Sequence, residues 1–123
     1  MRRSVLIVDD DDDVREVAAA SLELTRGWEV LTASCGHEAL AVAQRSAPDA
    51  ILLDVMMPDM DGPTLFGMLR TDRRTCEIPV ILLTAKAQAQ DRQRYLRIGV
   101  RDVIAKPFDP LTLADTIAAI LRW

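Results

Sequence analysis

The sequence lacks the features that mark membrane, secreted and disulfide-rich proteins. No apolar run approaches the roughly 18 residues needed to cross a bilayer, and the short run after Arg3 cannot serve as the core of a signal peptide. The two cysteines, Cys35 and Cys76, stand far apart and form no C-x-x-C motif, so both are expected to be reduced thiols. We therefore expect a cytoplasmic protein.

An excess of positive charge is also missing. The chain has 15 Lys and Arg against 19 Asp and Glu, which gives a net charge of −4 and an isoelectric point near 4.9. Domains that bind nucleic acid or an anionic membrane need a basic surface, so the negative net charge argues against direct binding of either. Aspartate outnumbers glutamate by 14 to 5, and five aspartates stand in a row at residues 9–13.

Length and composition predict a single globular domain. The chain has 123 residues, of which 50% are hydrophobic and 28% are charged, as is typical of one folded unit. We assign residues 1–123 to that unit and expect no output domain within it. A free-standing protein and a piece of a longer one both fit this length.

The apolar pattern alternates between two kinds of segment. Short apolar runs, typical of buried parallel strands, occupy residues 4–8, 28–32, 50–53, 79–83 and 102–105. Each run is followed by residues with helical periodicity, and in the last helix we expect Asp109 to be the N-cap and Pro110 the first helical residue. The pattern predicts an α/β fold, a single doubly wound (βα)5 domain with a five-stranded parallel sheet.

Polar residues follow four of the five predicted strands. They are Asp9 and Asp10 after the first strand, Asp54 after the third, Thr84 after the fourth and Lys106 after the fifth. The carboxyl ends of parallel strands meet at one edge of a sheet, where open α/β folds bind their ligands. We therefore expect three carboxylates, one hydroxyl and one ammonium to form a common site.

The chemistry of these groups favours phosphoryl transfer. Three adjacent carboxylates repel one another until a hard cation joins them, and Mg²⁺ typically takes one or two carboxylates together with water and phosphate oxygens. Asp54, at the end of the middle strand, is suited to act as a nucleophile. Lys106 and Thr84 are suited to hold the oxygens of the transferring group.

Four motifs, each at the end of a predicted strand, identify a family resemblance. They are Val8-Asp9-Asp10, the loop from Asp54 to Gly62, Leu83-Thr84-Ala85 and Lys106-Pro107-Phe108. With these motifs the chain, from Ser4 to about Leu121, resembles a two-component response-regulator receiver domain of the CheY-like family. The resemblance implies a flavodoxin-like sheet with the strand order 2-1-3-4-5.

The resemblance implies a phosphorylation site. Asp54 would accept a phosphoryl group from a phosphohistidine on a sensor histidine kinase or a phosphotransfer protein. Mg²⁺, or Mn²⁺ in its place, would be held by Asp10 and Asp54, by Asp9 mainly through water, and by the backbone carbonyl of Met56. Such a domain is a signalling switch in a phosphorelay, not an enzyme, because it catalyses only its own phosphorylation and dephosphorylation.

The resemblance also implies how the switch is built. Lys106 would pair with the phosphoryl group, and its peptide bond to Pro107 is usually cis in this family. Thr84, followed by Ala85, would move toward the phosphoryl oxygens and shift the face formed by the fourth helix, the fifth strand and the fifth helix, on which a downstream protein docks. Lys86 stands where the family tunes the lifetime of the phosphoryl group.

One position departs from the family pattern. Three residues before Lys106 the family usually has an aromatic residue whose rotamer couples to the threonine, and here that residue is Val103. Valine has no ring to turn inward and little rotamer freedom. We expect phosphorylation itself to be retained. We expect the conformational change of the partner-docking face to be weaker or to be transmitted differently.

Several other residues allow more than one interpretation. Arginines 92, 94, 97 and 101, together with Tyr95, make the fourth helix and the turn after it basic, which suits either a solvated face or a partner-docking surface. Asp59 and Asp61 are expected to form turns, since an EF-hand would need an acidic residue in place of Met57. Trp28 and Trp123 are expected to lie too far apart to form a stacking platform.

Two other functions fit the sequence less well. A haloacid-dehalogenase-like phosphatase also uses an aspartate nucleophile and Mg²⁺, but it needs an Asp-x-Asp motif, and here Asp54 is followed by Val55 and Met56. A flavodoxin-like cofactor binder needs a phosphate-binding loop rich in Gly, Ser or Thr after the first strand, where this chain has aspartates.

Overall fold

Strands and helices alternate along the whole described chain. The computed structural model describes residues 2–123. Within them the elements are β1 Ser4–Val8, α1 Asp12–Arg26, β2 Glu29–Ala33, α2 Gly36–Ser46, β3 Ala50–Asp54, α3 Gly62–Arg70, β4 Val80–Thr84, α4 Ala89–Ile98, β5 Asp102–Ala105 and α5 Leu113–Leu121. The predicted (βα)5 alternation is confirmed, and no predicted strand differs from the observed one by more than a residue at either end.

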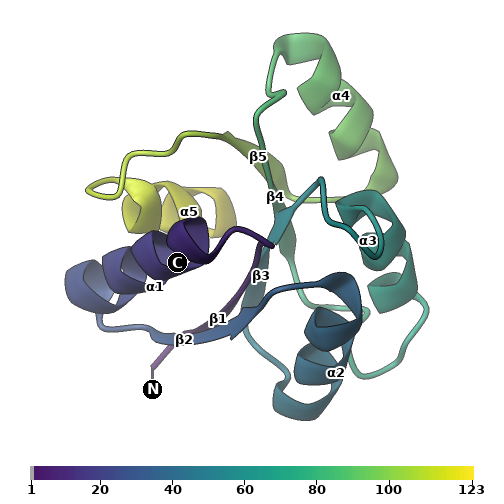
Figure 1. Ribbon diagram of the computed structural model, residues 1–123, viewed down its shortest axis with the longest axis horizontal. Coiled ribbons are helices and arrows are strands. Elements are labelled where there is room, and N and C mark those ends of the chain that lie inside the picture. Colours follow the sequence, from purple (N-terminus) through teal and green to yellow (C-terminus); the bar gives the residue numbers. More distant parts are fainter. Residues whose placement is uncertain (1) are drawn as a thin grey trace.

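The strands form one parallel sheet in the order β2-β1-β3-β4-β5. Helices α1 and α5 cover one face of the sheet, and α2, α3 and α4 cover the other (Figure 1). The predicted strand order and the doubly wound arrangement are both confirmed. All five carboxyl ends therefore lie at one edge of the sheet.

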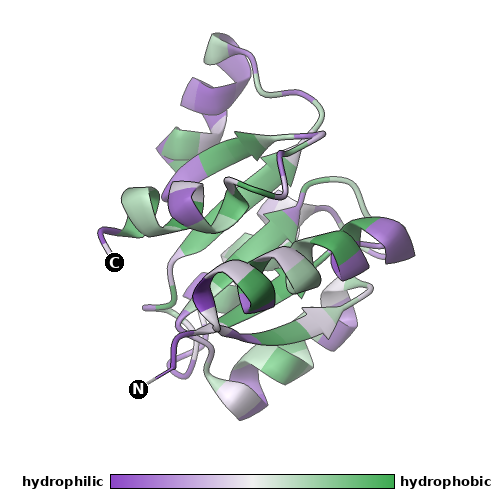
Figure 2. Cartoon of the chain, turned by 90° about the vertical axis from the view of Figure 1, so that its left-hand side faces the viewer, coloured by the Kyte–Doolittle hydropathy of each residue, from purple (hydrophilic) through white to green (hydrophobic). Residues whose placement is uncertain are grey.

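Each central strand contributes side chains to two apolar cores. In β1, Leu6 and Val8 join the cluster beneath α2, α3 and α4, whereas Val5 and Ile7 join the cluster beneath α1 and α5. Successive residues of a strand point to opposite faces, so a strand covered on both faces is apolar at every position. Figure 2 shows the strands mostly in green, whereas the helices carry both green and purple residues.

The acidic run that follows β1 begins a helix. Asp11 is the N-cap of α1, and its carboxylate accepts hydrogen bonds from the backbone N–H groups of Asp13 and Val14. Asp12 and Asp13 lie in the first turn, where negative charge is favourable next to the helix dipole. Gly27 ends the helix with φ of 64°, a left-handed conformation that costs glycine little. Asp11–Asp13 are thus capping and surface residues.

The start of the last helix differs from the prediction. Helix α5 begins at Leu113 with Thr112 as its N-cap, not after Asp109. Residues 110–112 form a turn in which the Asp109 carboxylate accepts the N–H of Leu111, and its backbone carbonyl accepts the N–H groups of Thr112 and Leu113. Asp109 therefore caps this turn, and Pro110 lies outside the helix.

The two tryptophans are also closer than expected. The rings of Trp28 and Trp123 pack edge to face, with centroids 5.1 Å apart and an interplanar angle of 86°. The prediction was wrong because α5 runs back toward the amino ends of the strands, where Trp28 precedes β2. The guanidinium of Arg3 lies 4.5 Å from the Trp123 centroid. This cluster joins the two ends of the chain, far from the carboxyl edge of the sheet.

Both cysteines, Cys35 and Cys76, are free thiols, as predicted. Among residues 2–123 there is no helix of the length and hydrophobicity that a membrane span requires.

The packing of Gly62 predicts a specific stability effect. A Cβ atom on Gly62 would lie 2.6 Å from the carbonyl oxygen of Asp54, whereas one on Gly67, in the same helix, would have no heavy atom within 4 Å. We expect Gly62→Ala to lower the free energy of unfolding by about 1–3 kcal/mol because backbone atoms must shift. Gly67→Ala should raise it by about 0.5–1 kcal/mol. Urea denaturation of both variants checks this, and equal effects would show that the contact at Gly62 is unimportant.

Candidate functional site

A cavity of about 450 Å³ opens at the carboxyl edge of the sheet. Its walls come from the loops after β1, β3 and β4, the end of β5, and α4. The lining residues are Asp9, Asp10, Asp11, Asp54, Val55, Met56, Thr84, Ala85, Lys86, Arg94, Tyr95 and Lys106. All the residues predicted to carry chemistry are therefore brought together, whereas Val103 and Pro107 do not line this cavity.

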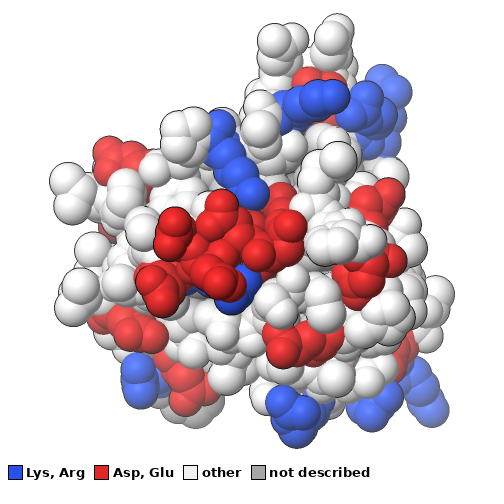
Figure 3. Space-filling view, viewed as in Figure 1, with Lys and Arg blue, Asp and Glu red and all other residues white. Residues whose placement is uncertain are grey.

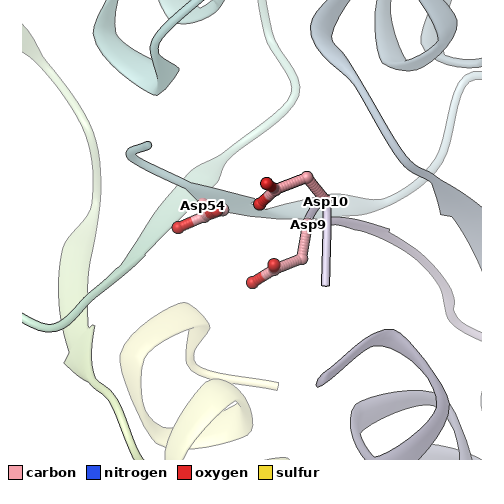
Figure 4. A group of neighbouring side chains, drawn as sticks. All are labelled: Asp9, Asp10 and Asp54. Atoms are coloured by element: carbon pink, nitrogen blue, oxygen red, sulfur yellow. The ribbon is translucent and has the colours of Figure 1, made fainter. Parts of the chain in front are cut away.

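Three carboxylates converge in the cavity. One oxygen each from Asp9, Asp10 and Asp54 lies within 4.8 Å of the others, and Figure 4 shows the side chains of Asp9 and Asp10 on the β1 side facing that of Asp54 at the end of β3. Asp9 and Asp54 are buried, and Asp10 is exposed. Figure 3 shows that acidic side chains gather near the centre of this face of the molecule.

The ammonium of Lys106 bridges the two buried carboxylates. Its Nζ atom lies 2.7 Å from Asp9 Oδ2 and donates a hydrogen bond of 3.0 Å to Asp54 Oδ1. The Lys106–Pro107 peptide bond is cis. The lysine is also fixed through its backbone, because its N–H donates to the carbonyl of Thr84 at 2.9 Å. Asp9, Asp54 and Lys106 thus form one charged unit across three strand ends.

One lysine does not neutralise two buried acids. Burial raises the pKa of Asp54 to about 6, and the negative charge of Asp9 acts in the same direction against the hydrogen bond from Lys106. Burial alone would lower the pKa of Lys106, but its contacts with Asp9 and Asp54 outweigh this and raise the pKa above its ordinary value. Lys106 therefore stays protonated, and negative charge remains in excess around it.

The acid cluster fits a hard divalent cation. Asp9 Oδ1 accepts the N–H of Asp11 at 2.9 Å. Asp9 Oδ2 is completely buried and, within residues 2–123, accepts no hydrogen bond, so that its only polar partner is the charge of Lys106. A buried carboxylate oxygen without hydrogen bonds is costly. Oxygen ligands from Asp9, Asp10 and Asp54 are the type that Mg²⁺ and Mn²⁺ prefer.

The Thr84 residue also lines the cavity. The residue is buried, and its Oγ1 accepts the backbone N–H of Lys86 at 3.0 Å. That bond uses a lone pair and leaves the hydroxyl proton free to be donated. Ala85 and Lys86 are exposed at the rim. Thr84 thus lies between the cavity and the β4–α4 loop.

Helix α4 contributes two lining residues that the sequence analysis did not assign to the site. Tyr95 is buried and Arg94 is exposed; the guanidinium lies 5.0 Å from the ring centroid and its Nη2 lies 3.4 Å from the phenol oxygen. The sequence carried one signal, a lone tyrosine next to Leu96 in a helix of mostly polar residues. Val103 on β5 is half-buried and packs against the same apolar cluster as Tyr95.

The rest of the basic helix face is partly neutralised. Arg92 forms a two-pronged ion pair with Asp102 at 2.8 and 3.1 Å, and Arg94 lies 3.4 Å from Asp91. Arg97 and Arg101 are exposed. The Arg92–Asp102 pair ties α4 to β5, whereas the Arg94–Asp91 pair lies within α4. Both pairs are compatible with a solvated face and with a partner-docking surface.

The aspartates after β3 stabilise loops, as predicted. Asp59 accepts the backbone N–H groups of Gly36 and His37 and contacts the His37 imidazole, which joins the loop to the start of α2. Asp61 caps α3 by accepting the N–H of Thr64. Neither residue lies in the acid cluster.

The raised pKa of Asp54 predicts a stabilising substitution. Since the pKa is about 6 in the folded chain and 3.8 ordinarily, ionisation of Asp54 destabilises the fold progressively from about pH 4 to about pH 6 and fully above. In EDTA near pH 7.5, Asp54→Asn should raise the free energy of unfolding by up to about 3 kcal/mol. Near pH 4 the gain should largely disappear. Urea denaturation at both pH values checks this, and a pH-independent difference would contradict it.

Comparison with known proteins points to one family. The sequence profile described as "Response regulator receiver domain" matches residues 5–118. The chain is 41% identical over 120 residues to the phosphate regulon transcriptional regulatory protein PhoB of Pseudomonas aeruginosa, covering 98% of this chain and 52% of that protein. It is 39% identical over 118 residues to the DNA-binding dual master transcriptional regulator RpaA of a Synechocystis strain, covering 96% and 48%.

The chain thus spans about half the length of the curated relatives it matches. Since the name of RpaA describes that protein as DNA-binding, the expectation that direct nucleic-acid contact is absent finds no support in these relatives.

Solved structures agree with the sequence relatives. The chemotaxis response regulator CheY4 of Vibrio cholerae superposes with a TM-score of 0.90 at 33% identity, covering 98% of this chain and 99% of that one. A CheY-like response regulator receiver domain protein from Methanospirillum hungatei gives a TM-score of 0.86 at 29% identity, covering 99% and 95%. Profile, relatives and fold agree with the geometry of the acid cluster, and the chain belongs to the response regulator receiver domain family.

Proposed function

We propose that this receiver domain is phosphorylated on Asp54. The observation that carries the proposal is the bridge of Lys106 between Asp9 and Asp54 beside the exposed carboxylate of Asp10. Asp54 is the only member of this group at the end of the central strand, and its neighbours supply one fixed cation and two further oxygen ligands. A nucleophile in that setting suits aspartyl-phosphate chemistry.

The transfer step uses the groups that line the cavity. An oxygen of the ionised Asp54 attacks the phosphorus of the donor, and a new O–P bond forms. The bond between phosphorus and the imidazole nitrogen of a phosphohistidine breaks, and the imidazole leaves with the electron pair. Because the pKa of Asp54 is about 6, the carboxylate is largely ionised at neutral pH.

Lys106 and Thr84 stabilise the charge that moves in this step. The ammonium of Lys106 already lies 3.0 Å from Asp54 Oδ1 and is suited to pair with a phosphoryl oxygen. The Thr84 hydroxyl has a proton free to donate to another. When bound by Asp9, Asp10, Asp54 and the Met56 carbonyl, Mg²⁺ or Mn²⁺ would neutralise phosphate charge. Hydrolysis of the aspartyl phosphate, with Lys86 and Ala85 at the cavity rim, would reset the domain.

The partners follow from this chemistry. The donor is a sensor histidine kinase or a phosphotransfer protein in the cytoplasm, which presents a phosphohistidine to the cavity. The receiver of the signal is a protein, or a following domain of the same protein, that docks on the face of α4, β5 and α5.

The assigned acceptor predicts a gain in mass. Incubation with acetyl phosphate and Mg²⁺ should raise the intact mass by one phosphoryl group, and Asp54→Asn should abolish the gain. Asp13→Asn is the matched control, because Asp13 is exposed on α1 outside the acid cluster. A gain that persists in Asp54→Asn would place the phosphoryl group elsewhere.

The assigned cation ligands predict a gain in stability. Because a metal that binds only the folded chain stabilises it, saturating Mg²⁺ should raise the free energy of unfolding by about 1–3 kcal/mol. Asp9→Asn should remove most of this increment, and Asp13→Asn should keep it. Urea denaturation with Mg²⁺ and with EDTA measures the increment, which would have to be equal in the two variants to refute the assigned ligands.

A further inference from the structure

Helix α4 has one buried anchor. Among its residues, Ala89 to Ile98, only Tyr95 is buried, with 8% of its surface exposed. Leu96 is half-buried, and the N-cap Gln88 makes no side-chain capping bond. Apart from these contacts, the Arg92–Asp102 ion pair ties the helix to β5. Figure 1 shows α4 projecting from the rest of the molecule. A helix held in this way depends strongly on the position of Tyr95.

The same side chain forms part of the cavity wall. Tyr95 lines the cavity together with Asp54, Thr84 and Lys106. It also belongs to the apolar cluster beneath α2, α3 and α4, against which Val103 packs. Tyr95 therefore lies at the boundary between the acceptor cavity and the apolar core. No other buried residue of α4 connects these two regions.

A phosphoryl group on Asp54 would change the electrostatic forces on the α4 side of the cavity. A phosphoryl group adds about −1.5 to −2 charges and three acceptor oxygens. The groups on the α4 side that can respond include the Thr84 hydroxyl, now bound to the Lys86 N–H, and the Arg94 guanidinium, now beside the Tyr95 ring and Asp91. A shift of either group alters the surroundings of the Tyr95 ring.

We propose that Tyr95 is the positioning residue that couples occupancy of the Asp54 cavity to the placement of α4. The inference rests on the proposed phosphorylation of Asp54 and specifies how it reaches the output face. The ring moves when Thr84 and Arg94 turn toward the phosphoryl group, and α4 follows because the ring is its anchor. Tyr95 takes no part in the transfer itself.

Tyr95 is the only tyrosine of the chain, so a single label reports on it. Protein expressed with 3-fluorotyrosine in place of tyrosine should give one ¹⁹F resonance. This resonance should shift when Mg²⁺ and beryllofluoride are added together, and it should shift much less with Mg²⁺ alone. Amide resonances of residues 89–99 should shift in the same sample. This measurement needs no variant, and a ¹⁹F resonance that stays in place while the amides of Val55 and Met56 shift would overturn the proposal.

Two variants separate the ring from the rest of the helix. In Tyr95→Leu the amides of Val55 and Met56 should still respond to Mg²⁺ and beryllofluoride, while the response of residues 89–99 should be lost. Leu96→Ala loosens the neighbouring contact of α4 outside the cavity and should keep that response. Tyr95→Phe retains the ring and should behave like the unsubstituted chain.

The outcomes distinguish the coupling from the proposed function. A helix α4 that responds normally in Tyr95→Leu would overturn the coupling and leave Asp54 as the acceptor. Loss of the Val55 and Met56 responses in Tyr95→Leu would overturn it too, because Tyr95 would then hold the phosphoryl group itself. Failure of the unsubstituted chain to gain mass with acetyl phosphate would overturn both proposals.

Discussion

The site depends on a single ammonium held between two buried carboxylates. Lys106 contacts Asp9 and Asp54 at the same time, and these three residues come from the ends of three different strands. Without that cation the two acids would repel each other in a place from which water is largely excluded. Even with it, burial keeps the pKa of Asp54 near 6. The cavity is therefore short of positive charge, which is the condition that a divalent cation corrects.

The rest of the fold supports this unfavourable arrangement. Strands β1, β3 and β4 are apolar on both faces and packed between two helical layers, so their ends are held rigidly where the charged groups begin. Other aspartates, outside the acid cluster, stabilise the loops after the strands: Asp11 caps α1, and Asp59 binds the start of α2. Aspartate thus has two separate places in this chain: some aspartates stabilise loops, and others are clustered with their carboxylates buried at a cost in stability.

Local patterns explain why so much could be predicted. Buried strands gave unbroken apolar runs, and the residue after each strand must lie at the shared edge, so Asp9, Asp54, Thr84 and Lys106 could be grouped from the amino-acid sequence alone. The start of α5 could not be predicted, since Asp109 and Pro110 suit a turn as well as a helix N-terminus. The contact of Trp28 with Trp123 joins segments nearly a chain length apart, and no local pattern carries such information.

By itself, the amino-acid sequence determined the alternation of strands and helices, the strand ends that carry chemistry and the motifs of the receiver family, because each of these depends on neighbours along the chain. Only the tertiary structure decided the state of each group: the buried oxygen of Asp9 that accepts no hydrogen bond, the raised pKa of Asp54, and the place of Tyr95 between cavity and core. The burial of a side chain and the charges around it both depend on residues that are distant in the sequence, so neither is set until the chain has folded.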